Sequence, residues 1–232
     1  MPSLNIYGLL IGIGVVVALE VSRKIAKIRE LRSDILDNAF WWAIIFGIIG
    51  ARMYHVIDLW EFYSENLINI FYIWNGGIGI WGAILGGFVG LLLFWKLHRI
   101  PPSEESLRAT SEEVSLLELL DVMVVGVPLA QAIGRWGNYF NNELWGKSGE
   151  PIFFYESVLN LVLFGILWRL RKNEKTGALA GVYLIGYGLI RGGLEWLRPE
   201  EIVWHLGSIP TAIIFCLISV FVGGLLICQR RS

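Results

Sequence analysis

The chain has 232 residues, of which 55% are hydrophobic and 17% are charged. An average soluble domain is about 45–50% apolar and about 25% charged, and a soluble globule of this size could not hide so much apolar surface from water, so we expect lipid to cover it. The net charge of −1 excludes a polybasic nucleic-acid-binding protein, and the abundance of Trp, Phe and Tyr excludes intrinsic disorder.

Seven apolar segments approach the roughly 20 residues that a helix needs to cross the ~30 Å hydrocarbon core of a bilayer. They are Leu4–Val21, Ala39–Ile57, Ile78–Trp95, Leu116–Ile133, Ile152–Leu170, Ala178–Trp196 and Leu206–Cys228. No positive residue precedes the first segment and no A-x-A-like site follows it, so we expect an anchor rather than a cleaved signal peptide. The sequence therefore predicts an all-α, polytopic integral membrane protein with seven transmembrane helices in a single transmembrane domain, residues 1–232.

The distribution of Lys and Arg predicts the orientation of these helices. All but five of the 19 positive residues lie in the tail, or in the loops after the first, third and fifth segments and the adjoining helix ends. Because cytoplasmic loops carry an excess of Lys and Arg, we expect the N-terminus to face out and the C-terminus in, as an odd number of crossings requires. The five exceptions are Arg52, Arg135, Lys147, Arg191 and Arg198.

Among the ionisable residues within the apolar segments we single out five: Arg52, Asp121, Glu156, Arg191 and Glu195. Each costs about 2.5–3.5 kcal/mol on insertion scales, so such side chains usually face the bundle interior or a wet cavity. Arg191 and Glu195 are four residues apart and Arg198 follows three later, so the three can share one helix face. A structural ion pair that locks this helix and a polar cavity lined by both signs are both open interpretations.

Glycines crowd the third segment. Gly82 and Gly86 lie four residues apart, a spacing that permits close helix contact. Gly76 and Gly77 precede the segment, and their backbone could either hold an anion or bend the chain.

The densest polar cluster, residues 134–147, follows the fourth segment and combines three Asn, a Glu, an Arg and large aromatic residues. Trp and Tyr are typical of the membrane interface, and Arg suits the bidentate binding of a phosphate. An ordinary outer loop would also be polar. If the cluster is functional, we expect an outward-facing polar cavity that binds an anion with an apolar body, meaning a phospholipid. The arginines expected around this cavity are Arg52, Arg135, Arg191 and Arg198.

The cluster contains a long, irregular motif: Gly134-Arg135-x-Gly137-Asn138-x-x-Asn141-x-Glu143-x-Trp145-Gly146. This motif closely resembles the signature of bacterial prolipoprotein diacylglyceryl transferases. Further similarities follow the family's order along nearly the whole chain. They are Tyr7-Gly8, Gly50-Ala51-Arg52 with Tyr54, Asp121, Pro151 with Tyr155 and Glu156, and Arg191-x-x-x-Glu195-x-x-Arg198.

The resemblance implies a transferase, with residues 1–232 as one catalytic domain in the bacterial cytoplasmic (inner) membrane. The implied reaction moves the diacylglyceryl group of phosphatidylglycerol to the thiol of the lipobox cysteine in the signal peptide of a preprolipoprotein. A thioether forms and glycerol phosphate leaves, as the first step of lipoprotein maturation. The resemblance implies an active site toward the outer leaflet, with membrane lipid and the preprolipoprotein as partners. It implies no cofactor, no metal and no nucleic acid.

The resemblance also implies the roles of individual residues. Arg135 would bind the phosphate of the lipid, with Arg191 as its partner and Glu195 orienting Arg191. Asn138 and Glu143 would hold the headgroup or the loop geometry. The further positions expected to bind substrate are Arg198, Tyr7, Gly76 and Gly146.

Two positions depart from the family pattern. Many members have a His in a Gly-Gly-x-x-x-His-Gly element, where this chain has Trp81, and an indole cannot take a proton from a thiol. If another group serves as the base, His55, His205 and Glu143 are the candidates, although each His is more often an interfacial or packing residue. The family's usual Gln before the seventh segment is also not found within Trp204–Thr211.

Two functions of other classes remain as alternatives. A transporter or channel subunit with an anion site at broken helices would explain the glycine pair at residues 76–77 and the intramembrane Arg and Glu. The sequence shows neither the inverted repeat nor the paired interrupted helices typical of that class. A noncatalytic membrane scaffold would leave the cluster at residues 134–147 unexplained.

Overall fold

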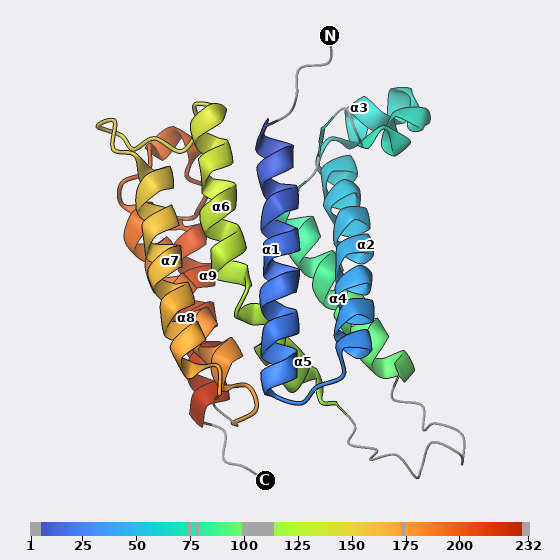
Figure 1. Cartoon of the computed structure of the whole chain (residues 1–232). Helices are drawn as coiled ribbons and strands as arrows, with labels where there is room; N and C mark the ends of the chain where they lie inside the picture. The colour runs from blue at the N-terminus through green and yellow to red at the C-terminus, as the bar shows by residue number, and fades with distance from the viewer. Residues whose placement is uncertain (1–5, 74–75, 78, 99–113, 173–174, 229–232) are drawn as a thin grey trace. The chain divides into compact units, whose positions relative to one another are not determined.

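A computed structural model of the chain describes residues 6–73, 76–77, 79–98, 114–172 and 175–228. These residues are mostly helical (Figure 1). The chain divides into two compact units. The first unit combines Met1–Glu30 with Leu117–Ser232, and the second unit is Leu31–Leu116.

The second unit is built on two long helices, α2 (Ser33–Asp58) and α4 (Ile80–His98), which pack against each other. Glycines line their contact: a Cβ atom added at Gly50 would lie 2.3 Å from the carbonyl oxygen of Gly82. The predicted close packing at the glycines of the third segment is confirmed, because only residues without a side chain let the two backbones approach this far.

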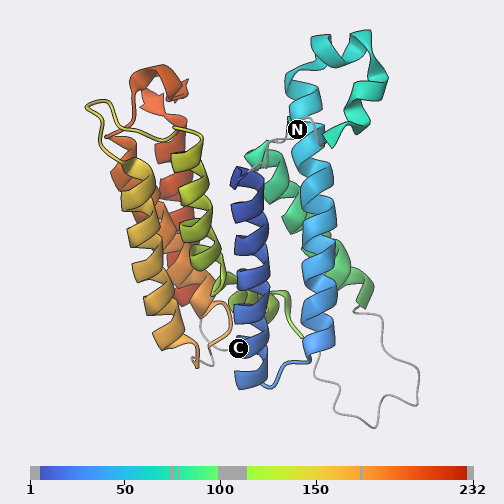
Figure 2. The ribbon, with the colours of Figure 1, turned by 45° about the horizontal axis from the view of Figure 1, so that its top comes forward.

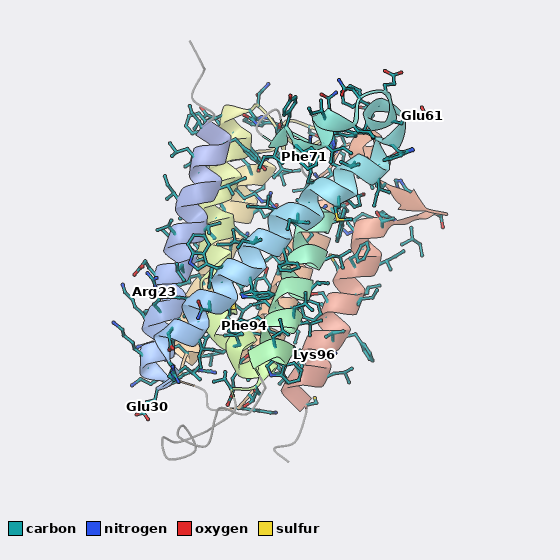
Figure 3. The ribbon with its side chains drawn as sticks, turned by 90° about the vertical axis from the view of Figure 1, so that its right-hand side faces the viewer. Arg23, Glu30, Glu61, Phe71, Phe94 and Lys96 are labelled. Atoms are coloured by element: carbon teal, nitrogen blue, oxygen red, sulfur yellow. The ribbon has the colours of Figure 1, made fainter. Side chains whose placement is uncertain are left out.

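A short helical excursion follows α2, and the sequence did not predict it. It comprises α3 (Trp60–Glu65) and the 3-10 helix η1 (Leu67–Phe71), which fold over beyond the end of α2 (Figure 2). Its apolar side chains are largely exposed, and Phe71, labelled in Figure 3, is 73% exposed. A helix whose apolar side chains are largely exposed has no helical period of core-facing residues, so the hydrophobic pattern does not predict it.

The first unit contains the remaining elements in chain order. They are α1 (Ile6–Ile28), α5 (Leu116–Val124), α6 (Val127–Phe140), α7 (Ile152–Leu170), α8 (Ala178–Glu195), η4 (Glu200–Ile202), β1 (His205–Leu206), β2 (Ile209–Pro210) and α9 (Thr211–Cys228). Neighbouring helices pack in the pairs α1–α6, α6–α7, α7–α8 and α8–α9. The chain of contacts therefore places α6, α7 and α8 in series, which positions the candidate site.

The fourth predicted segment, Leu116–Ile133, is not one helix. It is two helices, α5 and α6, which meet at an angle of 46°. Gly126 is the N-cap of α6, and Pro128 lies in its first turn; proline lacks the N–H that would continue a helix, and its ring clashes with the preceding turn. The second helix then runs on to Phe140, so the first half of the polar cluster is helical rather than part of a loop.

The seventh segment begins later than the predicted Leu206. Residues 205–210 form a two-stranded antiparallel hairpin, in which His205 pairs with Pro210 and Leu206 with Ile209. Gly207 makes the turn at a φ of 65°, a conformation that glycine adopts without strain. The helix starts only at Thr211.

Several helices can cross a bilayer. In the described part of the chain, α1, α2, α4, α7 and α9 are long and apolar enough, and the bent pair α5–α6 gives a sixth. Large apolar side chains on α9, such as Leu217 and Phe221, are 66% and 68% exposed, as expected of a surface covered by lipid. The prediction of an all-α, multi-pass membrane protein is confirmed, whereas seven crossings and the orientation of the termini stay predictions.

Candidate functional site

Arg135 lies on α6 at the centre of a polar cluster in the first unit. Its Nη2 donates to Glu156 Oε1 on α7 at 2.5 Å, and its Nη1 donates to Asn138 Oδ1 at 3.4 Å. The Glu156 side chain is only 4% exposed. A carboxylate buried this deeply needs a charged partner, so the pair holds α6 and α7 together and fixes the direction of the guanidinium.

The contacts continue from Asn138 to the loop that follows α6. Asn138 Nδ2 donates to Glu143 Oε2 at 3.0 Å, and Asn141 Nδ2 donates to Glu143 Oε1 at 3.3 Å. The backbone N–H of Glu143 donates to the Asn138 carbonyl at 2.8 Å. The structure thus brings Arg135, Asn138 and Glu143 of the motif together, and Glu143 is the exposed end of the chain of contacts.

A second charged group lies at the end of α8. Arg191 forms an ion pair with Glu195, as the spacing predicts, and Arg198 Nη1 lies 3.9 Å from the same Glu195 oxygen. Burial lowers the pKa of the Arg198 guanidinium, and the neighbouring charge of Arg191 lowers it further. Two arginines therefore share one buried carboxylate, and Arg198 is the less tightly paired of the two.

Tyr187 joins the two groups. It lies one helical turn before Arg191, and its hydroxyl donates to Glu156 Oε1 at 3.5 Å. Arg198 also interacts electrostatically with Glu156 and Arg135. Three helices, α6, α7 and α8, therefore converge on one cluster.

Buried carboxylates do not balance all the positive charge of this cluster, since its third carboxylate, Glu143, is exposed and accepts from Asn138 and Asn141. Its three guanidinium groups face two buried carboxylates, Glu156 and Glu195. The side chains of Arg135, Arg191 and Arg198 remain 26%, 22% and 21% exposed. The three arginines are thus neither fully buried nor fully neutralised, and they can still contact an anionic ligand.

Tyr7 and Gly146 frame the same region of the first unit. The Tyr7 ring on α1 packs against Gly137 of α6, where an added Cβ would lie 2.5 Å from Tyr7 Cδ2. Gly146 donates its N–H to the Glu150 carbonyl at 2.8 Å, and an added Cβ would lie 2.2 Å from Glu150 Oε2. Both contacts depend on a glycine, Gly137 in the first case and Gly146 in the second.

The loop after α6 is also tied to the segment after α8. The N–H of Lys147 donates to the Leu197 carbonyl at 2.9 Å, which fixes the residue preceding Arg198. Within the loop, hydrogen bonds from its own backbone N–H and from that of Ser148 lower the pKa of Glu150. The loop therefore has a defined conformation at the edge of the arginine cluster.

Arg52 and Gly76 lie in the second unit. All five N–H groups of Arg52 donate to backbone carbonyls. The prediction that Arg52 lines an anion cavity is therefore wrong, because it has no donor left for a phosphate. Gly76 has a φ of 88° and directs its carbonyl to Arg52, so the glycine pair bends the chain.

Asp121 does not belong to the arginine cluster. Its fully buried carboxylate accepts the N–H groups of Gly177 and Ala180, both at 2.8 Å, at the start of α8. Arg29 lies 3.4 Å away. Eleven residues of helix, about 16 Å at 1.5 Å per residue, separate Ala180 from Arg191. Of the two environments expected for such a residue, the bundle interior and a wet cavity, Asp121 occupies the bundle interior, where it caps the opposite end of α8.

The candidate bases occupy different elements. His55 Nδ1 lies 3.1 Å from the Tyr63 hydroxyl in the second unit. His205 lies exposed on β1, and Glu143 belongs to the arginine cluster. Trp81 takes the position of the family's His near the start of α4, where it is 39% exposed.

Two members of the cluster, Glu156 and Tyr187, were not among the predicted site residues. Both are on helices other than that of Arg135, so the motif on α6 could not reveal their contact with it. Their sequence positions did carry a signal, because Tyr187 lies four residues before Arg191 on the same helix face, and Glu156 is an ionisable residue within an apolar segment.

Comparison with known proteins identifies relatives over almost the whole chain. The family model described as prolipoprotein diacylglyceryl transferase matches residues 2–229. A phosphatidylglycerol–prolipoprotein diacylglyceryl transferase of Synechocystis sp. is 34% identical over 95% of this chain and 83% of its own length. A protein of the same name from Parasynechococcus marenigrum is 35% identical over 90% of this chain and 81% of its own length. One from Frankia casuarinae is 35% identical over 92% of this chain and 56% of its own length.

Proposed function

The chain belongs to the prolipoprotein diacylglyceryl transferase family, and on that premise we propose that it transfers the diacylglyceryl group of phosphatidylglycerol to a prolipoprotein. The acceptor is the thiol of the lipobox cysteine in the signal peptide. The thiol sulfur bonds to the glycerol carbon of the diacylglyceryl group, the bond from that carbon to the phosphate oxygen breaks, and glycerol phosphate leaves with its electron pair. The proton of the thiol passes to a base, for which His55, His205 and Glu143 are the candidates.

The arginine cluster is the observation that carries this proposal. Attack on an sp³ carbon with departure of a phosphate ester leaves negative charge on the phosphate oxygens. Guanidinium groups bind such oxygens through parallel hydrogen bonds, and donors fixed before the reaction stabilise developing charge most effectively. Arg135, Arg191 and Arg198 supply these groups, with an excess of positive charge over the two buried carboxylates.

We assign Arg135 to the phosphate of phosphatidylglycerol, with Arg191 and Arg198 completing its binding. Glu195 orients Arg191, and Asn138 and Glu143 hold the headgroup side of the cluster. Tyr7, Gly76 and Gly146 are further positions proposed to shape substrate binding. Of these, Tyr7 and Gly146 lie in the first unit with the arginines.

The finer topology is also part of the proposal. Residues 1–232 form one catalytic domain with seven crossings, in which α8, the sixth predicted segment, crosses in addition to α1, α2, α4, the pair α5–α6, α7 and α9. The N-terminus faces out, the C-terminus faces in, and the active site opens toward the outer leaflet. The positive charge of the loops supports this orientation, and the family indicates the bacterial inner membrane.

The proposal is tested with purified protein, phosphatidylglycerol vesicles and a synthetic lipobox peptide. Mass spectrometry of the peptide should show the gain of one diacylglyceryl group. Arg135→Ala should abolish the gain, because it removes both the contact with the lipid phosphate and the partner of Glu156. Arg23→Ala is the matched control, since Arg23 is paired with Glu20 on the exposed face of α1.

Absence of transfer by folded protein would refute the transferase assignment. Equal loss in Arg135→Ala and Arg23→Ala would refute the site assignment. A peptide without the lipobox cysteine should gain no mass, and a gain there would place the acceptor elsewhere.

A further inference from the structure

Arg52 is a buried arginine whose hydrogen bonds all go to the backbone of one irregular segment. It lies on α2 and is 7% exposed. The acceptors are the carbonyl oxygens of Asn69, Ile70, Tyr72, Gly76 and Gly77, at 2.5–3.4 Å. A guanidinium carries five N–H donors, so each donor has its own carbonyl.

The charge of Arg52 is balanced without a carboxylate. Across the residues that the structure describes, Arg52 forms no ion pair; its guanidinium carbon lies 5.1 Å from the centre of the buried Tyr63 ring. An isolated buried charge is very costly. Carbonyl dipoles and the face of an aromatic ring offset that cost, but only while the segment remains wrapped around the guanidinium.

The segment also depends on Arg52. Its carbonyls belong to the end of a 3-10 helix and to the irregular stretch after it rather than to a sheet or a long helix, and Arg52 donates a hydrogen bond to five of them. Gly76 and Gly77, with φ of 88° and 76°, turn two carbonyls toward the same Nη1 atom. At Gly77 an added Cβ would lie 2.8 Å from that atom and 2.7 Å from His55 Cε1.

We propose that Arg52 is the positioning residue of the segment made of residues 59–73, 76 and 77, which folds around the guanidinium group itself rather than around positive charge in general. Lysine would keep the charge, but its ammonium has three donors on a point charge and cannot serve five carbonyls arranged around a planar fork. This inference concerns the second unit alone and stands whether or not the transfer reaction is confirmed.

Hydrogen–deuterium exchange of the full-length protein in phospholipid nanodiscs tests the proposal. Arg52→Ala and Arg52→Lys should each speed exchange of peptides from this segment by at least about tenfold, because local opening sets the exchange rate, while peptides from α7 keep their rates. Millimolar methylguanidinium, far below denaturing concentrations, should restore protection in Arg52→Ala by filling the vacated site. Arg32→Ala is the control, since Arg32 is in the same unit with its side chain 74% exposed.

A glycine pair provides a test that keeps Arg52 intact. Gly77→Ala should open the segment more than Gly76→Ala, since both residues have positive φ but an added Cβ at Gly76 has no atom within 4 Å. The proposal is overturned by wild-type protection in Arg52→Lys or by a failure of methylguanidinium to slow exchange in Arg52→Ala. Equal exchange in the two glycine variants would also overturn it.

Discussion

Glu156 is the residue that determines where the Arg135 guanidinium points. Its buried carboxylate accepts from Arg135 and from Tyr187. Glu156→Gln keeps the size of the side chain and one acceptor oxygen but removes the charge. We expect kcat to fall about 10- to 100-fold, the loss that a small misplacement of a positioning group causes. The KM for phosphatidylglycerol should not rise, because the cluster gains net positive charge.

The measurement is steady-state transfer to a lipobox peptide over a range of lipid concentrations. Glu20→Gln is the control, since Glu20 pairs with Arg23 at an exposed position. A rise in KM at constant kcat would show that Glu156 contributes to lipid binding alone, contrary to a positioning role.

The sequence alone predicts those members of the arginine cluster that lie close together along the chain. Arg135, Asn138 and Glu143 belong to one motif, so their contact follows from a helix and the turn after it. Glu156 and Tyr187 meet Arg135 through the packing of α6, α7 and α8, which no local pattern encodes. For Arg52, the sequence predicts a polar environment, because a charged residue lies within an apolar segment. It does not reveal whether the partners of that charge are ligand atoms or backbone carbonyls.

Among the elements, α8 owes the position of its first turn to Asp121 of α5. The first N–H groups of a helix lack partners within the helix, and here a side chain distant in sequence accepts two of them. Asp121→Ala leaves these donors and Arg29 without the carboxylate. We expect the free energy of unfolding to fall by about 3–5 kcal/mol, as when one partner of a buried pair is removed.

Unfolding of the purified protein in detergent, by heat or by dodecyl sulfate, measures this loss. Asp121→Asn should lose less, because it keeps one acceptor oxygen. Glu20→Ala, at an exposed ion pair, should change stability by less than about 1 kcal/mol. Equal stability of the Asp121→Ala and Glu20→Ala variants would contradict the capping role.

The contact between α2 and α4 depends on where its glycines lie. At Gly50 an added Cβ would lie 2.3 Å from the Gly82 carbonyl oxygen, and at Gly47 the nearest atom would be 3.4 Å away, an ordinary contact. Gly50→Ala should therefore destabilise the protein by about 1–3 kcal/mol through overpacking. Gly47→Ala, one turn earlier, should be neutral or stabilising by up to about 1 kcal/mol through helix propensity. The same detergent unfolding assay compares them, and a more stable Gly50→Ala variant would refute the close contact.

Apolar length predicted the helices well and their interruptions poorly. Each of the seven predicted segments overlaps a helix or, for the fourth, a pair of helices, because an apolar stretch in lipid satisfies its backbone hydrogen bonds internally. The bend between α5 and α6 arises from Gly126 and Pro128 within a continuous apolar run, so hydropathy does not reveal it. The excursion of α3 and η1 is held by Arg52, a contact made across the second unit rather than along the chain.

For the whole molecule, whether α8 crosses the membrane determines on which sides the two termini lie. Five described helices and the bent pair can cross the membrane by length and composition, and α8 carries Arg191 and Glu195. If α8 crosses as well, the number of crossings is odd and the termini lie on opposite sides. If it does not, both termini lie on one side, and the positive residues near the C-terminus contradict the bias of the other loops.

The two native cysteines allow this to be tested. Cys228 is exposed at the end of α9, whereas Cys216 is buried within it, and Cys216→Ala leaves one thiol. In intact cells, we expect a membrane-impermeant maleimide to label Cys228 only after the membrane is opened, because the positive-inside bias places this end in the cytoplasm. An epitope tag on the N-terminus should bind antibody while the cytoplasmic membrane is still intact, once any cell envelope layer outside that membrane is removed. Labelling of Cys228 from the same side as the tag would mean an even number of crossings, and would place Arg191 and Glu195 on a helix that does not span the bilayer.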